Sequence, residues 1–293
     1  MDIWVEKHRP RELNQVVLDI LHQRLFQSFL DKGEIPHLLF AGGPGTGKTT
    51  IAKILINKLG AEYLELNASD ERGIGTIRDK VKSFLMTEVL IGCKFKVVFL
   101  DEADYLTPDA FAVLRRLLED HADTGKVIFS LNYLSKVPEA IVSRCQLVSF
   151  KPVKTRQMVP LFQSILEAEG KKSNLDQLLM LAEDCKGDLR RAIGILQRDS
   201  VGESFDYSGD LIGFNLDNFL LLAKAKSWDK LFTAALDIVD FQEVYRLLFD
   251  RYWGSNEKAT GIVGEFMYRD ASVFDRGLNL LTCISELLKY GCV

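Results

Sequence analysis

The sequence predicts an α/β domain with a parallel sheet, followed by two smaller all-helical domains. Five short apolar runs lie in the first half of the chain, and longer helix-like stretches separate most of them. Strands that alternate with helices favour a parallel sheet with helices on both faces. The expected strands are His37–Ala41, Tyr63–Leu66, Val97–Leu100, Val127–Leu131 and Leu147–Phe150.

Helical spacing accounts for most of the remaining chain. Before the first strand, apolar residues at three- and four-residue steps predict one helix over residues 13–32. Pro152 ends the last strand, and helical spacing resumes at Asp217 after a loop-rich stretch. The helices expected between them are Gln157–Glu169, Leu175–Cys185 and Leu189–Gln197. We therefore expect domains at residues 1–152, 153–203 and 204–293.

The composition is that of a folded protein of a reducing compartment. Of the 293 residues, 47% are hydrophobic, 27% are charged and only 7 are proline, unlike a disordered chain. No apolar run approaches the roughly 18 to 20 residues of a membrane helix, and no secretory signal opens the chain. The five cysteines form no CxxC pair and the four histidines are scattered. We expect no disulfide framework, no zinc site and a cytoplasmic location.

The net charge of −4 argues against a protein that coats nucleic acid by bulk attraction. A local basic track is compatible with it, because binding depends on where the cations lie. Between Glu71 and Lys96, six lysine and arginine residues stand against three acidic ones.

A glycine-rich loop follows the first expected strand. Residues Gly42–Thr49 read GGPGTGKT and match G-x-x-x-x-G-K-[ST], between an apolar strand and a helix that begins near Lys48. In such a loop, backbone N–H groups and the helix N-terminus face phosphates. We expect Lys48 at the β- and γ-phosphates and the Thr49 hydroxyl on Mg²⁺; the alternative is a glycine-rich turn without a ligand. The expected nucleotide-binding residues are Gly43, Pro44, Gly45, Thr46, Gly47, Lys48, Thr49 and Thr50.

Polar side chains follow the third and fourth expected strands. Asp101 and Glu102 follow Val97–Leu100, and ligands of parallel sheets lie at the carboxyl ends of strands. We expect Asp101 to support Mg²⁺ and Glu102 to orient and deprotonate the attacking water; a solvated turn or helix cap is the alternative. Asn132 would reach the water or the γ-phosphate, although an asparagine at a strand end is most often a turn former.

Together these residues resemble the replication factor C small subunits and their archaeal and phage counterparts, which are AAA+ ATPases. The matching segments follow one another in family order over roughly residues 3–198. They are Trp4–Pro10, Pro36–Gly42, Leu64–Gly73, Phe99–Asp104, Ser143–Cys145 and Gly187–Ala192.

The resemblance implies roles for residues that spacing alone does not assign. Arg144 would reach the ATP of a neighbouring subunit as an arginine finger, which can be worth ~10³–10⁵ in rate in GTPases. Arg190 would act on the chain's own nucleotide from a helical lid; Arg191 is about 100° away on the helix, so only one of them can face it. Either arginine could instead lie on a solvated helix face. The family usually has tyrosine where this chain has His8. The residues that would line the adenine pocket are Val5, Arg9 and Pro10.

By the same resemblance, the segment after Asp70 is the helix that tracks DNA. Arg78 and Lys82 are four residues apart and share a face of this helix. Arg72, at its start, would link DNA contact to the catalytic glutamate. An ordinary charged helix surface is the alternative for each. Apolar residues between Leu85 and Phe95 would either meet the sliding clamp or belong to the core.

The implied function is that of a clamp-loader subunit that uses ATP and Mg²⁺ to open a sliding clamp and place it on primer–template DNA. Its partners would be other loader subunits, including a distinct large subunit, in a ring or spiral held by a C-terminal collar; no membrane is expected. It would act at the replication fork in the nucleoid, or in host cytoplasm if phage-encoded. The alternatives are another AAA+ DNA-remodelling ATPase, such as a Holliday-junction motor or an initiator, and a catalytically inactive scaffold subunit of the loader.

Overall fold

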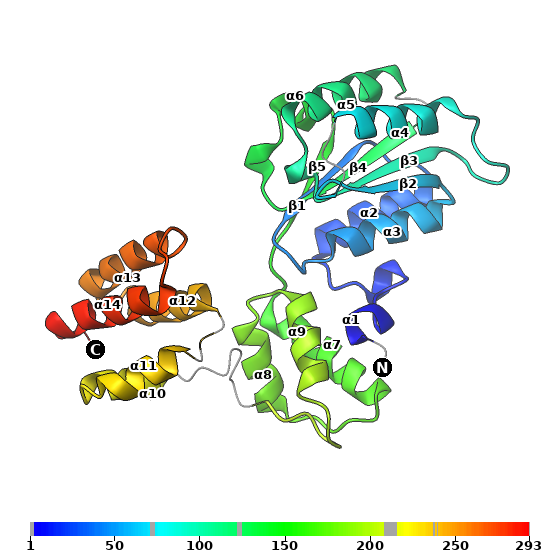
Figure 1. The fold of residues 1–293 in the computed structure, drawn as a ribbon. Helices are drawn as coiled ribbons and strands as arrows, with labels where there is room; N and C mark the ends of the chain where they lie inside the picture. Colours follow the sequence, from blue (N-terminus) through cyan, green and yellow to red (C-terminus); the bar gives the residue numbers. More distant parts are fainter. Residues whose placement is uncertain are drawn as a thin grey trace. The chain divides into compact units, whose positions relative to one another are not determined.

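The computed structural model divides the chain into two compact units, Met1–Tyr207 and Ser208–Val293 (Figure 1). It describes residues 3–70, 74–121, 125–207, 216–236, 238 and 240–292. Each unit is described by itself. The finer division into three domains stays a prediction.

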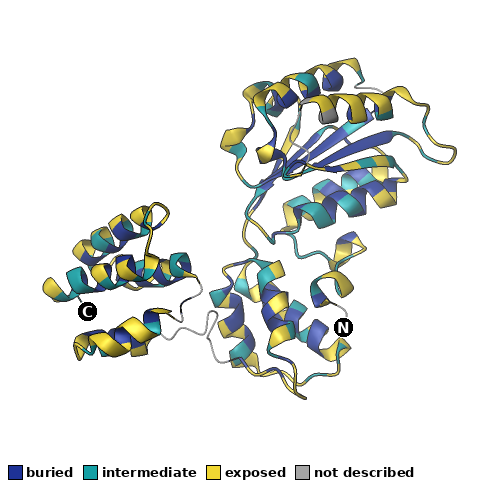
Figure 2. Ribbon diagram, viewed as in Figure 1, coloured by how far each residue is buried: buried dark blue, intermediate teal, exposed yellow. Residues whose placement is uncertain are grey.

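A five-stranded parallel sheet forms the centre of the first unit. The spatial order is β2-β3-β4-β1-β5, so β4 lies between β1 and β3. The inner strands are buried almost from end to end (Figure 2), as strands covered on both faces should be. All five strands predicted from the sequence are therefore confirmed. They are β1 (Leu38–Gly42), β2 (Glu62–Asn67), β3 (Lys96–Asp101), β4 (Gly125–Leu131) and β5 (Gln146–Phe150).

Alternate residues of the inner strands β1, β3 and β4 build two hydrophobic cores, one on each face of the sheet. Leu39 and Phe129 pack with α4, α5 and α6, whereas Phe40 and Ile128 pack with α2 and α3 (Figure 1). Helices on both faces thus fix the carboxyl edge of the sheet, where the predicted site residues emerge. The covering helices are α2 (Ile20–Lys32), α3 (Lys48–Leu59), α4 (Ile74–Met86), α5 (Pro108–Asp120) and α6 (Glu139–Val142).

The single helix predicted over residues 13–32 is wrong in its first part. A short 3₁₀ helix, η1 (Leu13–Gln15), is followed by extended backbone at Val16, and α2 begins only at Ile20. Asp19 starts the new helix by accepting a hydrogen bond from the His22 N–H, which is the role of an N-cap. The interruption places Val16 outside any helix, and it lines the pocket described below.

The rest of the first unit is helical. The three helices predicted after Pro152 are confirmed to within two residues. Trp4 is buried, and its backbone N–H donates to Gln197 Oε1 at 2.9 Å, so α1 packs against α9. The elements are α1 (Trp4–Lys7), η2 (Ala103–Tyr105), η3 (Leu134–Lys136), α7 (Thr155–Ala168), α8 (Leu175–Asp184) and α9 (Leu189–Arg198).

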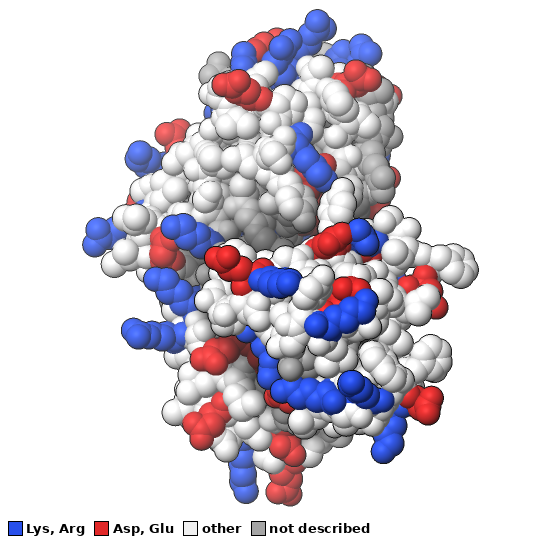
Figure 3. Space-filling model, turned by 90° about the vertical axis from the view of Figure 1, so that its left-hand side faces the viewer, with Lys and Arg blue, Asp and Glu red and all other residues white. Residues whose placement is uncertain are grey.

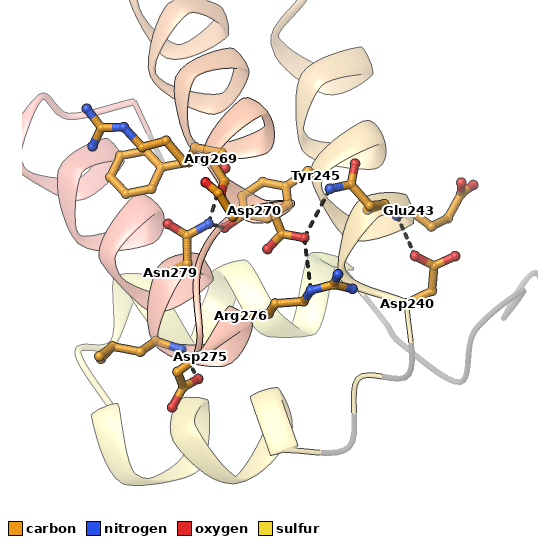
Figure 4. Close-up of polar contacts among 12 residues, drawn as sticks. Asp240, Glu243, Tyr245, Arg269, Asp270, Asp275, Arg276 and Asn279 are labelled. Carbon is orange, nitrogen blue, oxygen red and sulfur yellow. Dashed lines mark hydrogen bonds and ion pairs between the residues drawn. The ribbon is translucent and has the colours of Figure 1, made fainter.

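The second unit is a set of helices around its own hydrophobic core. A buried polar cluster joins three of them (Figure 4). Asn279 Nδ2 donates to the Tyr245 hydroxyl at 2.8 Å and to the Phe266 carbonyl at 3.1 Å. Asp270 Oδ2 accepts from Gln242 Nε2 at 3.0 Å, whereas its Oδ1 has no hydrogen-bond partner within the described structure. The helices described are α10 (Leu216–Lys224), α11 (Trp228–Leu236), α12 (Phe241–Tyr252), α13 (Glu257–Asp270) and α14 (Arg276–Lys289).

Within the described parts of both units, no helix is long and apolar enough to cross a membrane. Lysine and arginine are interspersed with aspartate and glutamate on the face drawn in Figure 3, and neither sign covers all of it. This pattern agrees with the small net charge and gives no support to general attraction of nucleic acid.

Candidate nucleotide-binding site

A pocket of about 420 Å³ opens at the carboxyl edge of the sheet in the first unit. Its walls come from the N-terminal segment, the loop after β1, the ends of β2, β3 and β4, and helices α7 and α9. Most of the predicted nucleotide-site residues therefore meet in one place. Those that line the pocket are Val5, Arg9, Pro10, Pro44, Gly45, Thr46, Gly47, Lys48, Thr49, Thr50, Asp101, Glu102, Asn132 and Arg190.

The loop after β1 is shaped by glycine and held against α9. Gly45 has a φ of +65°, and a Cβ added to it would come within 1.8 Å of Asp188 Oδ1, so the position requires glycine. The Gly45 carbonyl accepts from the Leu189 N–H at 3.2 Å. Asp188 caps α9 by accepting from the Arg191 N–H at 3.0 Å. The phosphate loop and the start of α9 therefore form one packed unit.

Lys48 is buried beside this loop with its ammonium group surrounded by oxygen atoms. Nζ donates to the carbonyls of Gly42 and Gly43, both at 2.7 Å, and to Asn132 Oδ1 at 3.0 Å. Burial lowers the pKa of Lys48 below its usual range, and the negative charge of Asp101 opposes part of that shift. A phosphate would give the same ammonium a charged acceptor and a stronger hydrogen bond. Gly43, a predicted nucleotide-binding residue, is not part of the described pocket lining; it contacts Lys48 through its carbonyl.

Thr49 and Asp101 offer the oxygen atoms that Mg²⁺ prefers. Thr49 Oγ1 donates to Asp101 Oδ2 at 2.9 Å, which brings the start of α3 to the end of β3. Within the described residues, no three His, Cys, Asp or Glu side chains gather as a metal site. A hydroxyl and one carboxylate still fit Mg²⁺, because this ion commonly binds through one or two protein groups plus substrate phosphates.

Glu102 follows Asp101 in a left-handed backbone conformation, with a φ of 54°. Its N–H donates to Asp101 Oδ1 at 3.1 Å. A non-glycine residue in this region stores about 1–3 kcal/mol of strain, which the surrounding structure must hold in place. Such strain is often found at functional sites.

Asn132 stands between the phosphate loop and the acidic pair because β4 lies between β1 and β3. Its side chain contacts Lys48, and its N–H donates to Asp104 Oδ1 at 3.3 Å. Asp104 is buried, with its Oδ2 at 3.9 Å from Lys136 Nζ. The strand end thus rests on a buried carboxylate to which we assigned no role from the sequence.

Several lining residues were missed by sequence reasoning. Glu65 and Asn67 alternate on β2, and Glu65 Oε1 lies 2.9 Å from Lys53 Nζ of α3. Period-two spacing at the end of a strand next to β3 is a signal that could have found them. The missed lining residues are Gln15, Val16, Val17, Lys53, Glu65, Asn67, Ser130, Leu131, Leu161, Leu189 and Ile193; His8, which we noted only as a departure from tyrosine, also lines the pocket.

The predicted arginines and the predicted DNA contacts occupy different parts of the first unit. Arg144 is exposed, its Nη2 is 2.5 Å from Glu119 Oε1, and it is not part of the described lining of its own pocket. Arg190 belongs to the lining and Arg191 does not. The predicted DNA contacts are divided: Arg78 and Lys82 are exposed on α4, and Arg72 lies outside the described residues.

Comparisons with known proteins match the same part of the chain. The profile of the ATPase family associated with various cellular activities (AAA) matches residues 38–153, from β1 to just beyond β5. The replication factor C small subunit of Archaeoglobus fulgidus is 46% identical over 212 residues, which are 70% of this chain and 66% of the relative. The replication factor C small subunit 1 of Pyrobaculum islandicum is 44% identical over 200 residues, with coverages of 66% and 60%. The replication factor C small subunit of Methanococcus maripaludis is 42% identical over 217 residues, with coverages of 70% and 68%. The aligned part thus spans between 60% and 68% of these relatives' length.

Proposed function

The chain belongs to the replication factor C small-subunit family, and from this premise we propose that it is an ATP-hydrolysing subunit of a sliding-clamp loader. The observation that carries the proposed hydrolysis is the presence of two hydrogen-bonded pairs in one pocket, Lys48 with Asn132 at 3.0 Å and Thr49 with Asp101 at 2.9 Å. This arrangement gathers a phosphate-binding cation, a metal-binding pair and a polar group for the γ-phosphate.

Each side chain has a distinct part in the proposed hydrolysis. Lys48 binds the β- and γ-phosphates, and Asn132 holds Lys48 and faces the γ-phosphate. Glu102 accepts a proton from the attacking water as general base. Arg190 of α9 adds positive charge from the lid. Chemistry of this class depends on positioning and charge stabilisation, with no covalent intermediate.

Thr49 and Asp101 would hold Mg²⁺, which supplies charge neutralisation at the phosphate oxygens when bound. The remaining wall of the pocket would receive the base. Its residues include Val5, Arg9 and Pro10, which are the proposed adenine contacts.

The assembly that we propose follows from the family and from the position of Arg144. ATP bound between subunits would build a ring or spiral with other loader subunits, including a large subunit, and with C-terminal helices as a collar. The spiral would open a sliding clamp and align it on primer–template DNA along α4, through Arg78 and Lys82 and, by the family pattern, Arg72. Hydrolysis would then release the closed clamp at the replication fork.

ATPase measurements with both macromolecular partners test this function. The chain, with its large subunit, is assayed with primed DNA, with a sliding clamp, and with both together; Lys48→Ala is the negative control. A clamp-loader subunit should give its highest rate only with both. Stimulation by branched or origin DNA without a clamp would point to a Holliday-junction motor or an initiator. A rate equal to that of Lys48→Ala would make the chain a scaffold subunit.

A further inference from the structure

The base side of the pocket is built jointly by two segments far apart in the sequence. One is the arm, which we define as residues 3–10, and the other is the pair of helices α7 and α9. The shape of this wall therefore depends on how the arm is held against the helices. Its residues are Val5, His8, Arg9 and Pro10 from the arm, and Leu161 and Ile193 from the helices.

One carboxylate receives two consecutive residues of the arm. Glu169, which follows the last turn of α7, has Oε1 at 2.8 Å from Lys7 Nζ and at 2.5 Å from His8 Nε2. Its Oε2 accepts from Lys7 Nζ at 3.0 Å. The side chain of Glu169 is only 13% exposed and that of His8 only 17%. The His8 part of this contact is therefore shielded from the water that weakens ordinary surface ion pairs, whereas Lys7, whose side chain is 45% exposed, adds a solvent-facing ion pair.

His8 connects this contact to the pocket and to the buried end of the arm. The His8 ring lines the pocket and meets Trp4 edge-on, with ring centroids 6.2 Å apart. Trp4 in turn is buried and bound to Gln197 of α9. A hydrogen bond from Lys7 and, to a smaller extent, one from His8 hold the pKa of Glu169 below its usual range. This carboxylate is therefore charged at neutral pH.

We propose that Glu169 is a positioning residue that clamps the arm onto α7 and thereby sets the base side of the nucleotide pocket. The ligand class is the purine end of a nucleoside triphosphate. The proposal rests on the proposed nucleotide site, and it concerns how tightly and how selectively that site binds. Glu169 itself does not line the described pocket, so its effect passes through His8 and the residues on either side of it.

The experiment compares Glu169→Ala with Glu167→Ala, an exposed glutamate of the same helix. Four quantities are measured on the full chain: the Kd for fluorescent analogues of ATP and of GTP, kcat for ATP, KM for ATP, and amide hydrogen exchange of a peptide covering the arm. In Glu169→Ala we expect Kd and KM to rise on the order of 10-fold with kcat nearly unchanged, because loss of a charge-assisted contact weakens binding rather than chemistry. Exchange in the arm should accelerate, and the preference for ATP over GTP should narrow. Glu167→Ala should leave all of these unchanged.

Two further variants guard against a general loss of folding. Glu169→Gln keeps one acceptor oxygen and should recover part of the affinity. Lys7→Met removes one of the two donors and should give a smaller shift in the same direction. Normal arm exchange and normal Kd in Glu169→Ala would overturn the proposal, as would a fall in kcat at constant KM.

Arm exchange and analogue binding require no hydrolysis, clamp or DNA. Failure of clamp-stimulated activity would therefore count against the clamp-loader function alone.

Discussion

At the scale of single residues, the proposed chemistry depends on a strained junction between β3 and η2. Asp101 ends the strand, and Glu102 turns the chain with its left-handed φ while its N–H stays bound to Asp101. Asp101, the proposed Mg²⁺ ligand, and Glu102, the proposed general base, are thus fixed by one short piece of backbone. Substitutions that preserve side-chain shape should separate their roles.

Glu102→Gln should leave ATP binding intact while lowering hydrolysis by about 10²–10⁴-fold. The amide retains the size of the carboxylate and can still orient water, but it cannot accept a proton. Equilibrium binding of an ATP analogue and single-turnover hydrolysis measure the two steps separately. A turnover rate close to that of the unchanged chain would remove Glu102 from the role of general base.

Gly45→Ala should destabilise the nucleotide-free chain by about 1–2 kcal/mol, because alanine is disfavoured at positive φ and its Cβ would collide with Asp188. Gly43→Ala is the matched control in the same loop, since Gly43 has no described atom within 4 Å of an added Cβ. Thermal unfolding without nucleotide measures both variants. Equal stabilities of the two would contradict the close approach of α9 to the loop.

The phosphate loop and the acidic pair could be predicted from sequence because each is a continuous motif with its strand or helix beside it. Lys53, Leu161 and Val16 could not, because their place in the pocket depends on contacts between separate elements. The same holds for the link between Glu169 and the arm. Short-range patterns report which backbone shape forms, whereas long-range packing decides which side chains meet there.

At the scale of elements, α4 carries the candidate DNA contacts on a helix that the core holds firmly. Val81 and Leu85 are buried in the core. Lys96, itself buried at the start of β3, donates to the carbonyls of Phe84 and Thr87 and so satisfies the end of the helix. Arg78 and Lys82 remain exposed.

Replacing Arg78 and Lys82 together with alanine should weaken DNA binding at all sequences and reduce the salt slope by about two, one for each phosphate contact. Binding of primed DNA across a salt series measures this slope. The double variant Lys224→Ala with Lys230→Ala removes the same charge from exposed positions in the second unit. A slope that is unchanged by the α4 pair, or changed equally by the control, would place the DNA elsewhere.

In the second unit, Asn279→Ala should destabilise the packing of α12, α13 and α14 by about 1–3 kcal/mol. The change leaves the buried Tyr245 hydroxyl without its donor, and unsatisfied buried groups carry this cost. Burial already raises the pKa of Tyr245 above its usual range, so ionisation offers no relief at neutral pH. Hydrogen exchange of peptides from residues 240–290 measures the local stability. Unchanged protection of these peptides would show that the polar cluster is dispensable.

Helix periodicity predicted most elements, and its one clear error is instructive. Apolar spacing continues from Leu13 to Lys32, yet the backbone is interrupted because Asp19 caps a new helix at Ile20. An aspartate just before a helix start is a readable signal, but the apolar pattern was given more weight. The C-terminal helices carry the same kind of signal, because Asp240, Asn256 and Asp275 cap the starts of α12, α13 and α14.

At the scale of the whole molecule, we propose that Arg144 completes the catalytic site of a neighbouring subunit. This side chain binds Glu119 and the Ala140 carbonyl on an exposed part of the chain, and it is absent from the described lining of the pocket. This position agrees with the proposed role of Arg144 as a finger that acts on the nucleotide of a neighbouring subunit. The pairing with Glu119 would orient it before that copy binds.

Arg144→Ala should leave ATP binding through Lys48 and Thr49 intact in each subunit and should lower DNA- and clamp-stimulated hydrolysis by about 10³-fold or more. Arg24→Ala, which removes an exposed arginine from α2, should leave the rate unchanged.

Mixing Arg144→Ala with Lys48→Ala gives the sharper test. At some interfaces in the mixture, the intact phosphate loop of an Arg144→Ala subunit meets the intact Arg144 of a Lys48→Ala subunit. Activity should therefore partly return as the mixing ratio is varied. If Arg144 acts within its own subunit, no ratio should restore activity, because every subunit then lacks either Lys48 or Arg144. Subunit exchange, followed with two fluorescent labels in the same samples, ensures that a flat ratio profile counts against the trans assignment rather than against mixing.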